Sequence, residues 1–133
     1  MRRIRLLIVD DSVVVRRVLT KIFESDPALE VVGIAATASI GIQKISQVQP
    51  DGVILDVEMP EMGGIEAVTH IRSGWPRLPV LMCSSLTERG TEVTVRALAA
   101  GASDYVAKPS SMSTDSRDFA GDLIAKVRAL GGK

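Results

Sequence analysis

Five polar residues of this 133-residue chain lie directly after short apolar runs, and their side chains together could carry phosphoryl chemistry. Asp10 and Asp11 follow residues 6–9, Asp56 follows 53–55, Ser84 follows 80–83, and Lys108 follows 105–107. Three carboxylates that lie close together raise one another's pKa, and a divalent cation is the simplest way to keep all of them charged. Oxygen ligands without His or Cys favour a hard ion, so this set predicts a site for Mg²⁺ or Mn²⁺.

Each member of the set has a place in phosphoryl transfer, which needs an in-line nucleophile, a metal ion, a cation and a donor to the equatorial oxygens. Asp56 is the predicted nucleophile, because it leaves a central strand, and a carboxylate nucleophile forms an acyl phosphate. Lys108 supplies the cation and Ser84 the hydroxyl donor. The backbone carbonyl of Glu58, two residues after Asp56, is placed to complete the metal shell.

The alternative for any one of these acids is a structural role, because an Asp after a strand commonly caps a helix or forms a turn. For Asp10 and Asp11 alone, the two interpretations carry equal weight. A shared site becomes the better interpretation when all five residues follow strands, since the carboxyl ends of parallel strands line one crevice.

The elements that must position these residues follow from the hydrophobic pattern, in which apolar runs of strand length alternate with segments of helical spacing. The predicted strands cover residues 6–9, 31–35, 53–55, 80–83 and 105–107. Helices are expected from Asp11 or Ser12 to Asp26, around a destabilising Gly41, from Ile65 to Ile71, over 88–100 behind a Thr87 cap, and over 117–130. Strands that are apolar on both faces and separated by helices predict an α/β fold with a doubly wound, five-stranded parallel sheet.

Composition limits the classes of function. The length suits one domain, and 46% hydrophobic residues with only 3% aromatic ones predict an aliphatic core. The 16 basic and 16 acidic residues balance, so we expect neither nucleic-acid binding nor membrane attachment. One cysteine, Cys83, excludes an internal disulfide, and the run 6–9 is too short for a signal peptide or a membrane span, so a cytoplasmic location is expected.

The sequence resembles the receiver domain of bacterial two-component response regulators, whose fold is flavodoxin-like, over essentially its whole length. The residues that carry the resemblance are Asp10-Asp11, Asp56 with Met59-Pro60, Ser84, Tyr105 and Lys108-Pro109. The resemblance implies that a sensor histidine kinase or a small phosphodonor phosphorylates Asp56. It also implies direct Mg²⁺ ligation by Asp11 and Asp56, with Asp10 acting mainly through water.

The same resemblance assigns parts in a conformational switch. Ser84 would move toward the phosphoryl group, Tyr105 would swing inward behind it, and Lys108 would contact the phosphoryl oxygens. Tyr105 could instead be an ordinary half-buried strand residue. The Lys108–Pro109 bond would be cis. Receivers commonly carry Asp-Gly where this chain has Gly63-Gly64, so we expect a softer start to the third helix.

Three segments narrow the resemblance to the receiver of the chemotaxis protein-glutamate methylesterase: residues 55–60, 84–90 and 104–109. That enzyme removes methyl groups from chemoreceptor glutamates with a C-terminal domain that its receiver blocks until phosphorylated. No Gly-x-Ser-x-Gly elbow is present, so this chain alone is not expected to be the esterase. We expect a piece of a longer protein or an isolated regulatory domain, with a core at 4–109, a loop at 110–116 and a helix at 117–130.

Three other functions stay open at this point. A phosphomonoester hydrolase that forms an aspartyl phosphate typically has Asp-x-Asp after its first strand, whereas this chain has adjacent Asp10 and Asp11. A stand-alone receiver could relay or buffer phosphate. A transcription-factor receiver fits the neutral charge less well. The segment 88–100 has more apolar residues than one helical stripe needs, so it could equally dock a partner or pack internally.

Overall fold

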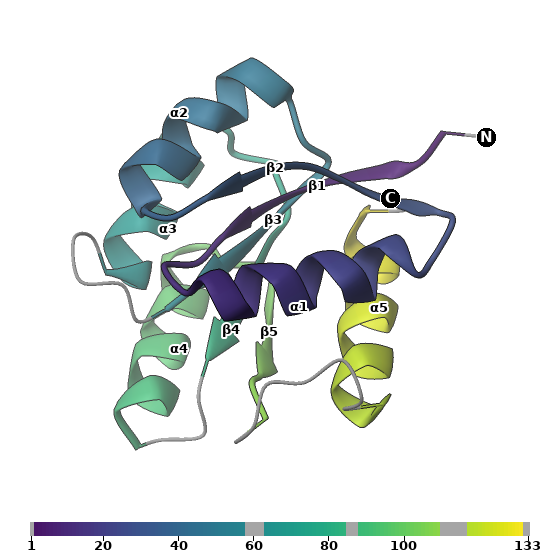
Figure 1. Cartoon of the computed structure of the whole chain (residues 1–133). Coiled ribbons are helices and arrows are strands. Elements are labelled where there is room, and N and C mark those ends of the chain that lie inside the picture. The colour runs from purple at the N-terminus through teal and green to yellow at the C-terminus, as the bar shows by residue number, and fades with distance from the viewer. Residues whose placement is uncertain (1, 58–62, 85–87, 110–116, 132–133) are drawn as a thin grey trace.

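A computed structural model of the chain describes residues 2–57, 63–84, 88–109 and 117–131, and their backbone forms one parallel sheet between two layers of helices (Figure 1). The sheet order is β2-β1-β3-β4-β5. The strands are β1 Ile4–Val9, β2 Leu29–Ala35, β3 Gly52–Asp56, β4 Val80–Ser84 and β5 Asp104–Ala107. The predicted α/β fold with a doubly wound, five-stranded sheet is confirmed, although β2 begins two residues before the predicted 31.

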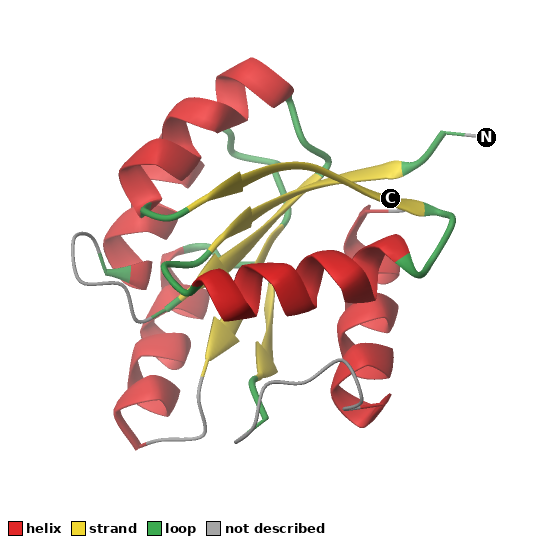
Figure 2. Cartoon of the chain, viewed as in Figure 1, coloured by secondary structure: helices red, strands yellow, loops and turns green. Residues whose placement is uncertain are grey.

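The helices are α1 Val13–Glu24, α2 Ala38–Val48, α3 Gly64–Gly74, α4 Glu88–Ala100 and α5 Arg117–Gly131, and they alternate with the strands along the chain (Figure 2). Side chains on a strand point to opposite faces in turn. In β1, Leu6 and Ile8 therefore pack with α1 and α5, whereas Leu7 and Val9 pack with α2, α3 and α4. Two aliphatic cores result, one on each face of the sheet, and they fix the strand ends that carry the polar residues. No helix among the described residues is both long and apolar enough to span a bilayer.

Two helix starts show how local chemistry sets the boundaries. The sequence left Asp11 and Ser12 as alternative caps for α1, and in the structure the Val15 N–H donates to Ser12 Oγ at 3.2 Å. Helix α3 begins after Gly63 without a side-chain cap hydrogen bond; the softer start expected from the Gly63-Gly64 pair stays a prediction. The predicted Thr87 cap of α4 lies outside the described residues.

Gly41 has a packing role that its helix propensity does not show. It lies inside α2, where glycine weakens a helix, but a Cβ atom at this position would lie 2.6 Å from Val9 Cγ2. The missing side chain lets α2 approach the end of β1 closely. Val9 is the last residue of that strand, so this contact supports the backbone that leads into Asp10.

We predict that Gly41→Ala lowers the free energy of unfolding by about 1 kcal/mol, because an overpacking cost of about 1–3 kcal/mol exceeds the gain of about 1 kcal/mol in helix propensity. Urea denaturation measures the difference. Gly121→Ala is the matched control: it also lies inside a helix, its Cβ would meet open space, and it should raise stability by about 0.5–1 kcal/mol. Equal stabilisation by both substitutions would show that α2 can move away from Val9 at no cost.

Candidate functional site

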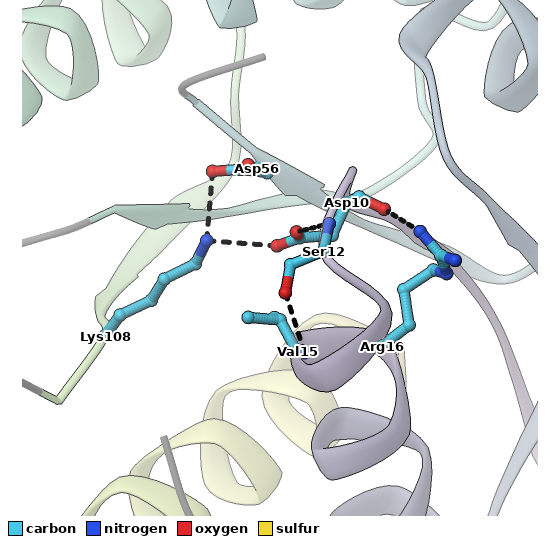
Figure 3. A network of polar contacts seen from close by, with 6 residues as sticks. All are labelled: Asp10, Ser12, Val15, Arg16, Asp56 and Lys108. Carbon is cyan, nitrogen blue, oxygen red and sulfur yellow. Dashed lines mark hydrogen bonds and ion pairs between the residues drawn. The ribbon is translucent and has the colours of Figure 1, made fainter. Parts of the chain in front are cut away.

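A buried ion-pair cluster lies where β1, β3 and β5 end (Figure 3). The Lys108 ammonium donates to Asp10 Oδ2 and to Asp56 Oδ1, both at 3.0 Å, so one cation bridges two carboxylates that are 46 positions apart in the sequence. The backbone of Lys108 is also fixed in place, because its N–H donates to the Ser84 carbonyl at 2.7 Å.

The third carboxylate of the cluster belongs to Asp11. One carboxylate oxygen from each of Asp10, Asp11 and Asp56 lies within 4.8 Å of the others, which is compact enough for one metal ion to contact all three. Asp10 and Asp56 are buried, whereas Asp11 is exposed. The structure thus brings four of the predicted site residues together, with the exposed acid on the solvent side of the cluster.

The electrostatics of the cluster are set by a balance between burial and pairing. Burial raises the pKa of the Asp10 carboxyl above its ordinary value, and the Lys108 charge opposes this only in part. Burial alone would lower the pKa of the Lys108 ammonium, but the charges of Asp56 and Asp10 outweigh it and raise that pKa. Lys108 therefore stays charged, and a further cation beside Asp10 would favour the ionised carboxylate.

Asp10 has a structural role in addition to its place in the cluster. The Ser12 N–H donates to Asp10 Oδ1 at 2.9 Å, and Arg16 Nη1 donates to the Asp10 carbonyl at 2.7 Å (Figure 3). The turn-forming role and the cluster role were alternatives in the sequence, and the geometry combines them, because each carboxylate oxygen takes a different donor. Arg16 was missed, since no sequence signal connects a helix arginine with one particular backbone carbonyl.

The other predicted residues lie around this cluster. Ser84 ends β4 and is buried, next to the β3 strand that carries Asp56. Tyr105 is 44% exposed, and Lys126 of α5 donates to its carbonyl at 2.6 Å with its ammonium 5.0 Å from the ring centroid. Glu58 lies outside the described residues. The ring of Tyr105 is therefore partly open to solvent, and a cation–π contact with Lys126 holds it there.

The expected cis bond between Lys108 and Pro109 is wrong, because no peptide bond of the described residues is cis. A trans bond before proline is favoured by about 0.5–1 kcal/mol unless the surroundings oppose it. Here the trans form already allows the Lys108 backbone to bond Ser84 and its ammonium to reach both carboxylates.

The buried thiol of Cys83 lies on the same strand as Ser84. Burial raises the pKa of this thiol to about 12, so it stays protonated at neutral pH and does not compete as a nucleophile or metal ligand. Cys83 fills the core, where it lies in one cluster with Ile54 and Leu81.

The comparisons with known proteins agree on one family. Residues 6–114 match the response regulator receiver domain family. The chain is 49% identical over 130 residues to a protein-glutamate methylesterase/protein-glutamine glutaminase of a Nocardioides species, and this alignment covers 96% of the chain and 36% of that protein. The chain spans about a third of the length of the curated relatives it matches.

Solved structures show the same fold. The response regulator domain of CheB from Thermotoga maritima superposes with a TM-score of 0.87 at 39% identity, covering 99% of this chain and 98% of that one. The CheX–CheY–BeF3–Mg complex from Borrelia burgdorferi matches with a TM-score of 0.80 at 27% identity, covering 97% of this chain and 90% of that one.

We predict that Lys108→Ala, in the presence of EDTA at pH 7, lowers the free energy of unfolding by about 3 kcal/mol, because two buried carboxylates lose their cation. Without the lysine the folded-state pKa of Asp10 rises further, so the penalty grows as the pH rises through that pKa and shrinks as the pH falls toward 4. Urea denaturation at several pH values measures this. Lys21→Ala, an exposed lysine of α1, is the control, and a Lys108 deficit that does not vary with pH would contradict the electrostatic explanation.

Proposed function

Because this chain belongs to the response regulator receiver domain family, we propose that it is a phosphoacceptor switch in which Asp56 takes a phosphoryl group. The observation that carries the proposal is the Lys108 bridge between Asp10 and Asp56, which places a buried carboxylate beside a fixed cation and two further acids. A structural ion pair alone would not need three converging carboxylates.

Asp56 is the proposed nucleophile because it ends the middle strand of the sheet, between β1 and β4. One of its oxygens would attack the phosphorus of the donor. A phosphorus–oxygen bond forms, giving an acyl phosphate, while the bond from phosphorus to the donor breaks and its electron pair leaves with the donor. Lys108 is placed to contact the transferred group, since its ammonium already lies 3.0 Å from Asp56 Oδ1.

The three acids fit Mg²⁺ or Mn²⁺, since all their ligand atoms are oxygens and they lie within reach of one ion. Asp11 and Asp56 would hold it directly, Asp10 through water, and the Glu58 carbonyl would complete the shell. When bound, the ion neutralises the charge that phosphoryl oxygens bring to the site. The likeness to a receiver described with Mg and BeF3 supports this choice.

The proposed switch uses the residues around the cluster. A phosphoryl group adds charge and acceptor oxygens at Asp56, and the Ser84 hydroxyl and the Lys108 ammonium would donate to them only in the active arrangement. Tyr105 would then leave its exposed position and turn inward behind Ser84. The contact with Lys126, whose ammonium lies 5.0 Å from the ring centroid, holds the ring in its exposed position and would have to break for this turn.

The wider function of the protein is part of the proposal. The relatives support a receiver of a two-component chemotaxis system, phosphorylated by a sensor histidine kinase in the cytoplasm, whose output is a methylesterase domain acting on chemoreceptor glutamate methyl esters. The chain itself spans only about a third of such a relative. A stand-alone receiver that relays or buffers phosphate, or a receiver of another output type, is the alternative, and the full-length gene decides between them.

We predict that Asp56→Asn abolishes phosphorylation by acetyl phosphate and Mg²⁺, because an amide oxygen is a poor nucleophile and cannot form an acyl phosphate. Intact-protein mass spectrometry measures the gain of one phosphoryl group. Asp118→Asn, at an exposed position in the first turn of α5, is the control and should label like the unchanged protein. Normal labelling of Asp56→Asn would refute the nucleophile assignment.

We also predict that Mg²⁺ raises the thermal midpoint of unfolding and that EDTA reverses the shift, because an ion that binds only the folded state stabilises it, by about 2.7 kcal/mol at a concentration one hundred times its dissociation constant. Asp11→Asn should remove most of this stabilisation, whereas Asp122→Asn, on the exposed side of α5, should keep it. An undiminished shift in Asp11→Asn would exclude Asp11 as a ligand.

A further inference from the structure

A hollow lies at the opposite end of the sheet from Asp56, where the strands begin. This amino-end groove has a volume of about 670 Å³ and is formed by the segments that lead into the strands. Arg2 and Arg3 lead into β1, Asp51 into β3, Arg77 into β4 and Ser103 into β5. Leu130 and Gly131, in the last turn of α5, close one side. The ion-pair cluster lies at the carboxyl ends of the same strands, so the groove is separate from it.

The groove carries an excess of positive charge. Among the described residues that line it, Asp51 is the only acid; it forms an ion pair with Arg2 and also accepts the Arg5 backbone N–H at 2.9 Å. Within the part of the chain that the structure describes, the exposed side chains of Arg3 and Arg77 make no ion pair or hydrogen bond. Two guanidinium groups with their donors facing solvent are therefore available to carboxylates, which they bind in a bidentate manner.

A third arginine, Arg72, adds to this positive charge through its contact with Ser103, which lines the groove. Arg72 of α3 donates to the Gly101 carbonyl at 2.7 Å, to the Trp75 carbonyl at 3.0 Å and to Ser103 Oγ at 3.4 Å. All three partners are neutral, so no carboxylate offsets this guanidinium among the described residues. Ser103 accepts the Val80 N–H as well, at 3.0 Å, which leaves its hydroxyl proton to donate to a ligand in the groove.

The walls of the groove are fixed by backbone bonds between neighbouring segments. The Ile4 N–H donates to the Ala28 carbonyl at 2.8 Å, and the Asp51 N–H donates to the Arg5 carbonyl at 2.7 Å. Ile4 and Leu130 give the groove an aliphatic side. A preformed surface that combines aliphatic and cationic groups loses little entropy on binding.

The shape and lining restrict the ligand. None of the described residues that line the groove is aromatic, so none of them would stack on a nucleobase. The apolar notch between the sheet and α5, next to the groove, holds only about 10 Å³, which is too little for an acyl chain. An anionic chain that lies along an open surface and places a small apolar side chain against Ile4 and Leu130 fits both observations.

We propose that the amino-end groove binds an acidic peptide segment of a partner protein, with its carboxylates on Arg3 and Arg77 and an aliphatic side chain against Ile4 and Leu130. The site does not depend on the proposed phosphorylation, because it lies at the other end of the sheet. A partner bound there would leave Asp56 open to its phosphodonor.

The test uses a hexapeptide of four glutamates and two leucines, titrated into ¹⁵N-labelled protein, with amide chemical shifts followed by NMR. We expect saturable shifts at Arg3, Ile4, Arg77 and Ser103. The double variant Arg3→Ala/Arg77→Ala should weaken binding about two- to thirtyfold, because two exposed ion pairs of the usual strength are lost. Arg17→Ala/Arg117→Ala removes the same charge from exposed arginines outside the groove and should bind like the unchanged protein.

Three results would overturn the proposal. Shifts spread over all basic surfaces, with equal weakening in both double variants, would mean non-specific charge attraction. Equal affinity for a peptide with alanines in place of the leucines would remove the role of Ile4 and Leu130. Tighter binding of inorganic tripolyphosphate would assign the groove to a small anion instead. The thermal midpoint of each variant checks its folding, and acetyl phosphate labelling of the same samples shows whether Asp56 reacts independently.

Discussion

The arrangement of this domain depends on the need to place two carboxylates in a buried crevice and to hold a cation between them. Asp10 and Asp56 are both buried, and two carboxylates side by side in a buried site repel each other without compensation. Lys108 provides it with two bonds of 3.0 Å, although it lies 98 positions from Asp10 and 52 from Asp56 in the sequence. The fold must therefore bring the ends of β1, β3 and β5 to one point, although β5 is the edge strand of the sheet.

The sheet order β2-β1-β3-β4-β5 meets this requirement because the chain reverses its direction of winding beside β1. Helices α1 and α5 then cover one face and α2, α3 and α4 the other, and the crevice opens at the carboxyl ends of the strands. Aliphatic side chains that alternate along β1 and β3 tie each strand to both cores. The acids thus project from backbone that two layers of packing hold in place, which favours the fixed geometry that the proposed phosphoryl transfer needs.

The sequence was sufficient for the fold and for the members of the ion-pair cluster, because both follow from short-range patterns. Apolar runs mark strands, and polar residues directly after them mark one edge of the sheet. It was insufficient wherever the answer depends on a contact between distant segments. The packing role of Gly41 depends on its close approach to Val9. The contact of Arg16 with the Asp10 carbonyl depends on the orientation of α1 relative to the end of β1. The expected cis bond at Lys108–Pro109 failed because it was taken from the resemblance and not from any residue pattern.

The distribution of charge is the clearest case in which the folded structure shows something that the composition does not. The chain has 16 acidic and 16 basic residues, and from this balance we expected neither nucleic-acid binding nor membrane attachment. Folding separates the charges along the strands, however. The acids of the cluster gather at the carboxyl ends, whereas Arg3, Arg72 and Arg77 lie around the groove at the amino ends without a carboxylate partner among the described residues. A neutral total is therefore compatible with two local fields of opposite sign, each suited to a different ligand: a metal ion at one end and a carboxylate at the other.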